Sequence, residues 1–140
     1  MKTGNRGKTI IKSFEKCKLA AYMPTADDVP TVGWGHTKNV KLGDKITEDQ
    51  AEVFLCEDLE WVENCINKYV HVELTQNKFD ALASLIFNIG CTNFRNSTLL
   101  RLLNQGDDCS GQFLRWNKQG NQVLRGLTLR REEERRLFLS

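Results

Sequence analysis

The first apolar stripe of the chain lies near its N-terminus. Ile10, Ile11 and Phe14 fall at helical spacing, and polar residues such as Lys12 occupy the opposite face. This periodicity predicts a helix from residue 6 to about residue 16.

A different pattern follows in residues 20–37. This segment holds both prolines and two consecutive acids, and it alternates between apolar and polar positions up to Trp34. Alternation bounded by turn residues is typical of short strands, so we expect a small antiparallel hairpin or meander here.

Helical spacing returns after Gly43. Thr47 and Gln50 fit a capping box, and the apolar face that follows predicts a long helix. Thr75 caps a second helix, closed by Gly90, whose apolar residues cover most of its circumference. Such a helix is expected to be buried at the centre of the molecule.

The rest of the chain also favours helix. Asn96 or Ser97 is expected to cap a short helix over Leu99–Leu103, residues 107–117 suggest another, and Thr128 is expected to start a charged final helix. The sequence therefore predicts one α+β domain, mostly helical, over residues 1–140. A small β lobe spans about residues 18–45, and a ligand cleft lies between it and the helical body.

Composition excludes several classes of protein. The 140 residues carry 20 basic and 18 acidic side chains, a net charge of +2, and no apolar run approaches the ~20 residues of a membrane span. Basic residues exceed acidic ones by four in residues 1–40 and by three in residues 101–140, while acids exceed bases by five between them. This distribution suits a weakly held polyanion. The glutamates at 132–134 among the C-terminal arginines argue against nucleic acid.

The N-terminus and the cysteines indicate the compartment. Residues 1–16 hold no apolar core of a secretory signal, so we expect a protein that stays in the cytosol unless something releases it. Five cysteines cannot all pair internally, and none shows metal-ligand spacing. We therefore expect all five to be reduced, small apolar residues, and we expect no metal or cofactor.

Glu15 is the first candidate for chemistry. It falls at about 140° from Ile10 on a helical wheel of about 100° per residue, at the edge of the apolar stripe. A carboxyl there would be partly desolvated, as the proton donor of a glycoside hydrolase must be. Asp27 and Asp28 follow in the β segment as candidates for a second carboxylate, and the Thr31 hydroxyl could hold a water.

The residues around Glu15 resemble the signature of phage-type lysozymes, glycoside hydrolase family 24. That signature is a glutamate near the end of the first helix, an Ala-Tyr pair (here Ala21-Tyr22), and a Thr-[Ile/Val]-Gly-x-Gly-His-Thr motif, here residues 31–37. The resemblance continues in residues 58–62, 84–90, 96–98, 125–127 and 130–138, so it covers nearly the whole chain.

The resemblance implies a lysozyme-like fold and an endolysin. Such an enzyme hydrolyses the β-1,4 bond between N-acetylmuramic acid and N-acetylglucosamine in peptidoglycan. It implies a monomer that accumulates in the host cytoplasm and reaches the periplasmic cell wall through a separately encoded holin, without membrane insertion.

The resemblance also implies roles for individual residues. Glu15 matches the general acid, and Thr31 matches the threonine that helps to place the attacking water. His36 is expected to be architectural, and Arg130 or Arg131 to pair with the acid, although a solvated helix start would give the same pattern. Candidate substrate contacts are Trp34, Thr37, Phe87, Asn88 and Ser97, of which Trp34 could instead fill the β lobe. We expect Trp61 and Trp116 to be core residues.

One position departs from the family. The second carboxylate usually lies two residues after the tyrosine, where this chain has Pro24. The segment up to Thr31 is also one residue longer, so Asp27 or Asp28 could take the role, with Asp27 slightly favoured. If neither does, a lytic transglycosylase that needs no water, or a relative that binds glycan without cutting it, are the alternatives.

Overall fold

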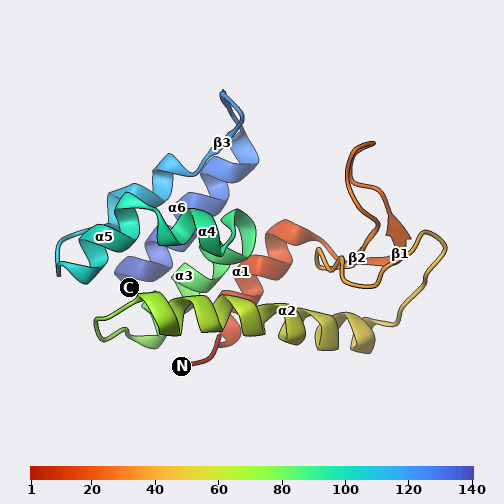
Figure 1. The fold of residues 1–140 in the computed structure, drawn as a ribbon, viewed down its shortest axis with the longest axis horizontal. Helices are drawn as coiled ribbons and strands as arrows, with labels where there is room; N and C mark the ends of the chain where they lie inside the picture. Colours follow the sequence, from red (N-terminus) through yellow and green to blue (C-terminus); the bar gives the residue numbers. More distant parts are fainter.

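The computed structural model describes residues 1–140 as a helical body joined to a small β lobe (Figure 1). In chain order its elements are α1 (Asn5–Glu15), β1 (Lys18–Tyr22), β2 (Thr31–Gly33), α2 (Glu48–Tyr69), α3 (Gln76–Ile89), α4 (Cys91–Arg95), α5 (Thr98–Asn104), the 3₁₀ helix η1 (Ser110–Arg115), β3 (Lys118–Gln119), β4 (Gln122–Val123) and α6 (Arg125–Leu139).

Helix α3 forms the centre of the helical body. Its residues from Phe79 to Ile86 are all buried, and it packs against α1, α2 and α6. The prediction of a central buried helix is confirmed. Because α1 and α6 both pack on α3, the first and the last helix of the chain share one hydrophobic core.

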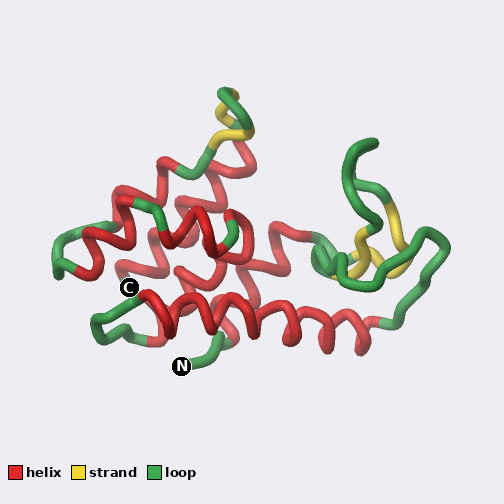
Figure 2. Tube along the Cα trace, viewed as in Figure 1, coloured by secondary structure: helices red, strands yellow, loops and turns green.

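The β lobe is a single antiparallel pair of strands with its connecting loops. Lys18 lies opposite Gly33 and Tyr22 opposite Thr31, and a bridge from Ala20 to Lys45 ties the following loop to β1. Figure 2 shows that this lobe consists mainly of loops and that α2 runs from beneath it to the helical body. The α+β class, dominated by helix, is confirmed.

The predicted helix starts that depend on a side-chain cap are confirmed. Thr47 accepts a hydrogen bond from the Gln50 amide, and the Gln50 side chain accepts one from the Thr47 amide, as a capping box requires. The Thr75 and Ser97 side chains cap α3 and α5 by accepting a hydrogen bond from the Lys78 and Leu100 amides, without the reciprocal bond of a capping box.

The C-terminal third differs from expectation in detail. Helix α6 begins at Arg125, not at Thr128, and has no side-chain cap; the Thr128 hydroxyl instead donates to the Leu124 carbonyl within the first turn. Only residues 110–115 of the predicted 107–117 helix are helical, as a 3₁₀ helix. Helix α4 and the β3–β4 hairpin were not expected. No helix combines the length and the apolar character needed to cross a membrane.

The expectation that all five cysteines are reduced is wrong for two of them. Cys65 near the end of α2 and Cys91 at the start of α4 form a disulfide, with their Cα atoms 6.0 Å apart. Cys17, Cys56 and Cys109 are free thiols. The separation of 26 residues between Cys65 and Cys91 carries no local signal in the sequence. Only the packing of α2 against α4 reveals that they pair.

Candidate active site

Glu15 is the last residue of α1, at the junction with the β lobe. Lys16 follows with a φ of 54° and ends the helix, which directs the chain into β1. The Glu15 side chain is 22% exposed. A Cβ atom at Gly35 would lie 3.3 Å from the Glu15 Oε1 atom, and Gly35 has a φ of +81°. Glycine at this position lets the β lobe approach the carboxylate closely.

Arg130 holds Glu15 from the side of the helical body. The Arg130 Nη1 group donates to Glu15 Oε2, its Nη2 group donates to the Ser84 carbonyl at 3.0 Å, and its Nε group donates to Glu134 Oε2 at 3.2 Å. The guanidinium is buried, so these three acceptors fix its position. The expected pairing of an arginine with Glu15 is present, and the alternative of a solvated helix start is wrong.

Arg131 also contacts Glu134, and it reaches Asn88 on the other side of the site. It is fully buried and donates to Asn88 Oδ1 at 2.9 Å and to the Trp116 carbonyl at 3.2 Å. Its Nη2 group donates to Glu134 Oε2 at 3.1 Å. Burial lowers the pKa of Arg131 and raises that of Glu134, and each group's charge opposes the shift of the other. With its Oδ1 atom held by Arg131, the Asn88 amide has a fixed orientation.

His36 and Asp58 connect the β lobe to α2. The buried His36 ring contacts both Asp58 carboxylate oxygens through Nδ1, at 3.0 and 3.1 Å, and stacks on Phe54 with ring centroids 4.1 Å apart. Burial raises the pKa of Asp58, and the bond to His36 acts in the opposite direction. These contacts hold the β lobe against α2, and the architectural role of His36 stays a prediction.

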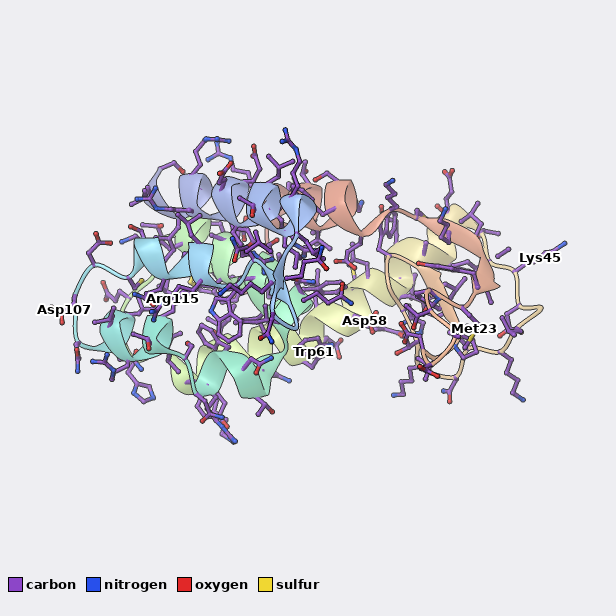
Figure 3. The ribbon with its side chains drawn as sticks, turned by 90° about the horizontal axis from the view of Figure 1, so that it is seen from above. Met23, Lys45, Asp58, Trp61, Asp107 and Arg115 are labelled. Carbon is purple, nitrogen blue, oxygen red and sulfur yellow. A yellow bond between two sulfur atoms is a disulfide. The ribbon has the colours of Figure 1, made fainter.

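A cavity of about 380 Å³ lies between the lobes and opens beside Glu15. Figure 3 shows two of its residues, both on α2: Asp58 between the helical body and the β lobe, and Trp61 at the near edge of the body. The residues that line the cavity come from α1, the β lobe, α2 and α3: Glu15, Gly35, Thr37, Lys38, Asp58, Trp61, Phe87 and Asn88. The cleft therefore combines carboxylates, an amide, a cation and two aromatic rings.

The structure brings four of the predicted site residues into this lining. They are Glu15, Thr37, Phe87 and Asn88, while His36, Arg130 and Arg131 hold lining residues from behind. Trp34 and Ser97 are not part of the lining. The Trp34 ring is half-buried with Lys12 Nζ 4.7 Å from its centroid, and the Ser97 hydroxyl caps α5.

Asp27 and Asp28 also lie outside the lining. Both are exposed in the loop between β1 and β2, where Asp28 Oδ1 accepts a hydrogen bond from the Val29 amide at 2.8 Å. Thr31 is buried in β2, and its hydroxyl donates to the Val29 carbonyl at 3.0 Å. The two carboxylates that line the cleft are Glu15 and Asp58.

Sequence reasoning missed Lys38, Asp58 and Trp61 as lining residues. Asp58 and Trp61 lie one turn apart on α2, on the side that α2 turns to the cleft. Helical periodicity assigned Trp61 to the core, but its side chain is 41% exposed. The expectation is wrong because Trp61 lies beside the buried stripe of Leu59 and Val62, on the side of α2 that lines the cleft next to Phe87. Trp116 is half-buried and packs against the core.

No three His, Cys, Asp or Glu side chains gather in a way that could hold a metal ion. The cleft itself offers a carboxylic acid beside a buried arginine, with a wall that combines polar and aromatic groups. An acid placed in this way can protonate an oxygen leaving group.

The known proteins that this chain resembles are phage lysozymes, endolysins and a muramidase domain. A family model described as phage lysozyme matches residues 12–134. The endolysin of Acyrthosiphon pisum secondary endosymbiont phage 1 is 44% identical over 146 residues, covering 100% of this chain and 99% of that relative. The endolysin of Salmonella phage P22 is 42% identical over 147 residues, with the same coverage. The solved muramidase domain of SpmX from Asticaccaulis excentricus has a TM-score of 0.92 at 36% identity, covering 99% of this chain and 98% of that one.

Proposed function

Because this chain belongs to the phage lysozyme family, we propose that it is an endolysin that hydrolyses the β-1,4 bond between N-acetylmuramic acid and N-acetylglucosamine in peptidoglycan. The observation that carries the proposal is the Glu15 carboxyl at the open cleft, paired with the buried Arg130. Relatives named endolysin and a structural neighbour named a muramidase domain support it.

Glu15 acts as the general acid in this proposal. It gives its proton to the glycosidic oxygen as the C1–O bond breaks, and a water oxygen forms the new bond at C1 and loses a proton to a base. Arg130 stabilises the carboxylate that remains after proton transfer, because it already donates to Glu15 Oε2. The buried acceptors around Arg130 keep its charge in place through the cycle.

Thr31 is proposed to help to place the water. Its hydroxyl hydrogen is engaged by the Val29 carbonyl, so its oxygen is left as an acceptor for a hydrogen of that water. A water held in this way points a lone pair away from Thr31, which is the orientation an attacking water needs.

Asp27 or Asp28 is proposed as the second carboxylate, since Pro24 cannot serve as one. Both acids lie on the loop that joins the two strands of the β lobe, and both are exposed. The proposal requires this loop to move towards Glu15 when glycan binds. With a water between the carboxyls, their separation should become ~6.5–9.5 Å and the anomeric centre should invert.

A turbidity assay tests the function: the fall in turbidity of a suspension of outer-membrane-permeabilised cells measures their lysis. The unmodified chain should clear the suspension and Glu15→Gln should not, because the amide cannot donate a proton. Glu60→Gln, which removes an exposed carboxyl from α2, is the matched control and should clear normally. Clearing that survives Glu15→Gln would move the active site elsewhere, and no clearing by the unmodified chain would favour a glycan-binding relative.

Product and variant analysis tests the second carboxylate. A free reducing end indicates hydrolysis, whereas a 1,6-anhydro end indicates a transglycosylase that uses Glu15 alone. Asp27→Asn and Asp28→Asn should separate the two candidates, and wild-type rates in both variants would contradict the proposal. Action as a monomer, holin release from the cytoplasm and a single domain over residues 1–140 remain predictions.

A further inference from the structure

Trp61 exposes a large aromatic surface where the family resemblance assigns no substrate contact. It lies on α2, is 41% exposed and lines the cleft that contains Glu15 (Figure 3). Leaving an indole partly in water forgoes the free energy that its burial would give. A ligand that covers the ring would recover that free energy, which makes an exposed tryptophan in a cleft a candidate binding group.

Phe87 lies next to the Trp61 ring. The two ring centroids are 6.5 Å apart and the ring planes differ by 16°, so the rings are nearly parallel. Phe87 lies on α3, is half-buried and lines the same cleft. Together the two side chains form one aromatic wall, which we call the Trp61–Phe87 wall. One of its rings comes from α2 and the other from α3.

Polar groups with fixed positions lie next to this wall. Asn88 follows Phe87 in sequence and is oriented by Arg131, while Glu15 is oriented by Arg130. A pyranose ring has an apolar face of C–H groups and an edge of hydroxyl and acetamido groups. An aromatic surface beside a fixed amide and a carboxyl matches these two sides of one sugar.

The disulfide links α2 to the start of α4, which directly follows α3. Cys65 lies four residues after Trp61 on α2, and Cys91 lies four residues after Phe87, just beyond the end of α3. A covalent link one turn away limits sliding of α2 against α3, so the two rings keep their relative position.

We propose that Trp61 is the sugar-stacking residue of this cleft. The C–H face of an N-acetylhexosamine unit lies on its indole, next to the bond that Glu15 protonates, and Phe87 extends the aromatic surface beside it. This inference rests on the proposed function for the identity of the sugar. It adds a residue that contacts substrate without taking part in proton transfer.

Binding to an uncut ligand tests the assignment separately from catalysis. In the Glu15→Gln background, calorimetry with N-acetylglucosamine tetramer should show that Trp61→Ala raises Kd by about fivefold to tenfold, while Trp61→Phe stays within about twofold to threefold. Val53→Ala, which trims another exposed apolar residue of α2 outside the cleft lining, should leave Kd unchanged. A Kd within twofold for Trp61→Ala, or no binding of the tetramer at all, would overturn the proposal.

Fluorescence gives a second readout that does not require a truncated side chain. The chain has three tryptophans, Trp34, Trp61 and Trp116. Tetramer should change the emission of the Glu15→Gln protein and of its Trp34→Phe and Trp116→Phe forms, and the change should disappear in Trp61→Phe. A response that persists without Trp61 contradicts the assignment. No clearing by the unmodified chain would refute the proposed function alone, because these binding measurements do not depend on cleavage.

Discussion

The Glu134 carboxylate receives contacts from three buried side chains. Ser84 Oγ donates to it at 2.5 Å, Arg130 Nε at 3.2 Å and Arg131 Nη2 at 3.1 Å. Each of the two arginines in turn fixes a residue of the cleft, Glu15 or Asn88. Glu134 is therefore the shared counter-charge for two guanidiniums that would otherwise be buried next to each other.

Glu134→Gln should lower the free energy of unfolding by about 3–5 kcal/mol. The substitution keeps the shape of the side chain and removes the charge that compensates Arg130 and Arg131, and breaking a buried ion pair on one side is costly. Urea denaturation followed by circular dichroism measures the change.

Glu133→Gln provides the matched control. Glu133 is the adjacent residue, about half-exposed, and pairs with Arg136 on the surface. Exposed pairs of this kind contribute little to stability, so this variant should unfold close to the unmodified protein. Equal unfolding midpoints for Glu134→Gln and Glu133→Gln would show that the contacts of Glu134 with Arg130 and Arg131 do not stabilise the fold.

At the scale of elements, the Cys65–Cys91 bond ties α2 to α4 across 26 residues of sequence. The closed loop contains the connection from α2 to α3 and all of α3, the central helix. Closing a loop of this size restricts the unfolded chain, which in the loop-entropy account contributes about 3 kcal/mol.

Cys91→Ser should therefore lower the free energy of unfolding by about 3 kcal/mol under non-reducing conditions. Cys56→Ser, which changes an exposed free thiol on the same helix α2, should have little effect. Adding a reductant should remove the difference between Cys91→Ser and the unmodified chain. Titration of five free thiols in the unfolded, unreduced protein, in place of three, would contradict the pairing, because the buried Cys109 becomes accessible only on unfolding.

At the scale of the whole molecule, the hydrophobic core lies entirely in the helical body and not in the β lobe. The core cluster contains 19 buried residues, and none of them lies between residues 18 and 45. The β lobe buries only a few side chains of its own, among them Thr31, Val32 and His36. Figure 1 shows that α1 and α2 both lead from the body to this lobe, and His36 of the lobe contacts Asp58 of α2.

Hydrogen exchange should reflect this asymmetry. Amides of β1 and β2 should exchange through local opening well before those of α3, which exchange only with global unfolding, because few buried apolar contacts oppose opening of the lobe. Mass spectrometry of peptides that cover residues 18–33 and 76–89 measures both regions in one experiment. Equal protection in the two would show that the β lobe unfolds only together with the body.

Some features of this protein are determined by residues close together in the sequence. The caps Thr47, Thr75 and Ser97 act on amides within three residues, so the starts of α2, α3 and α5 could be predicted. Helix α6 lacks such a cap, and its start at Arg125 was placed three residues too late. Glu15 was found because the residues around it form a motif, and its place at the end of α1 follows from local periodicity.

The tertiary structure decided everything that depends on contacts between distant residues. The sequence alone determined the α+β class, the capped helices and the acid at the end of α1, because these follow from hydrogen bonds and periodicity over a few residues. Only the packing of α2 against α3 and α4 showed that Trp61 faces the cleft and that Cys65 meets Cys91. Only the packing of α6 on α3 separated the buried Glu134 from the exposed Glu133, since burial depends on long-range contacts that periodicity does not encode.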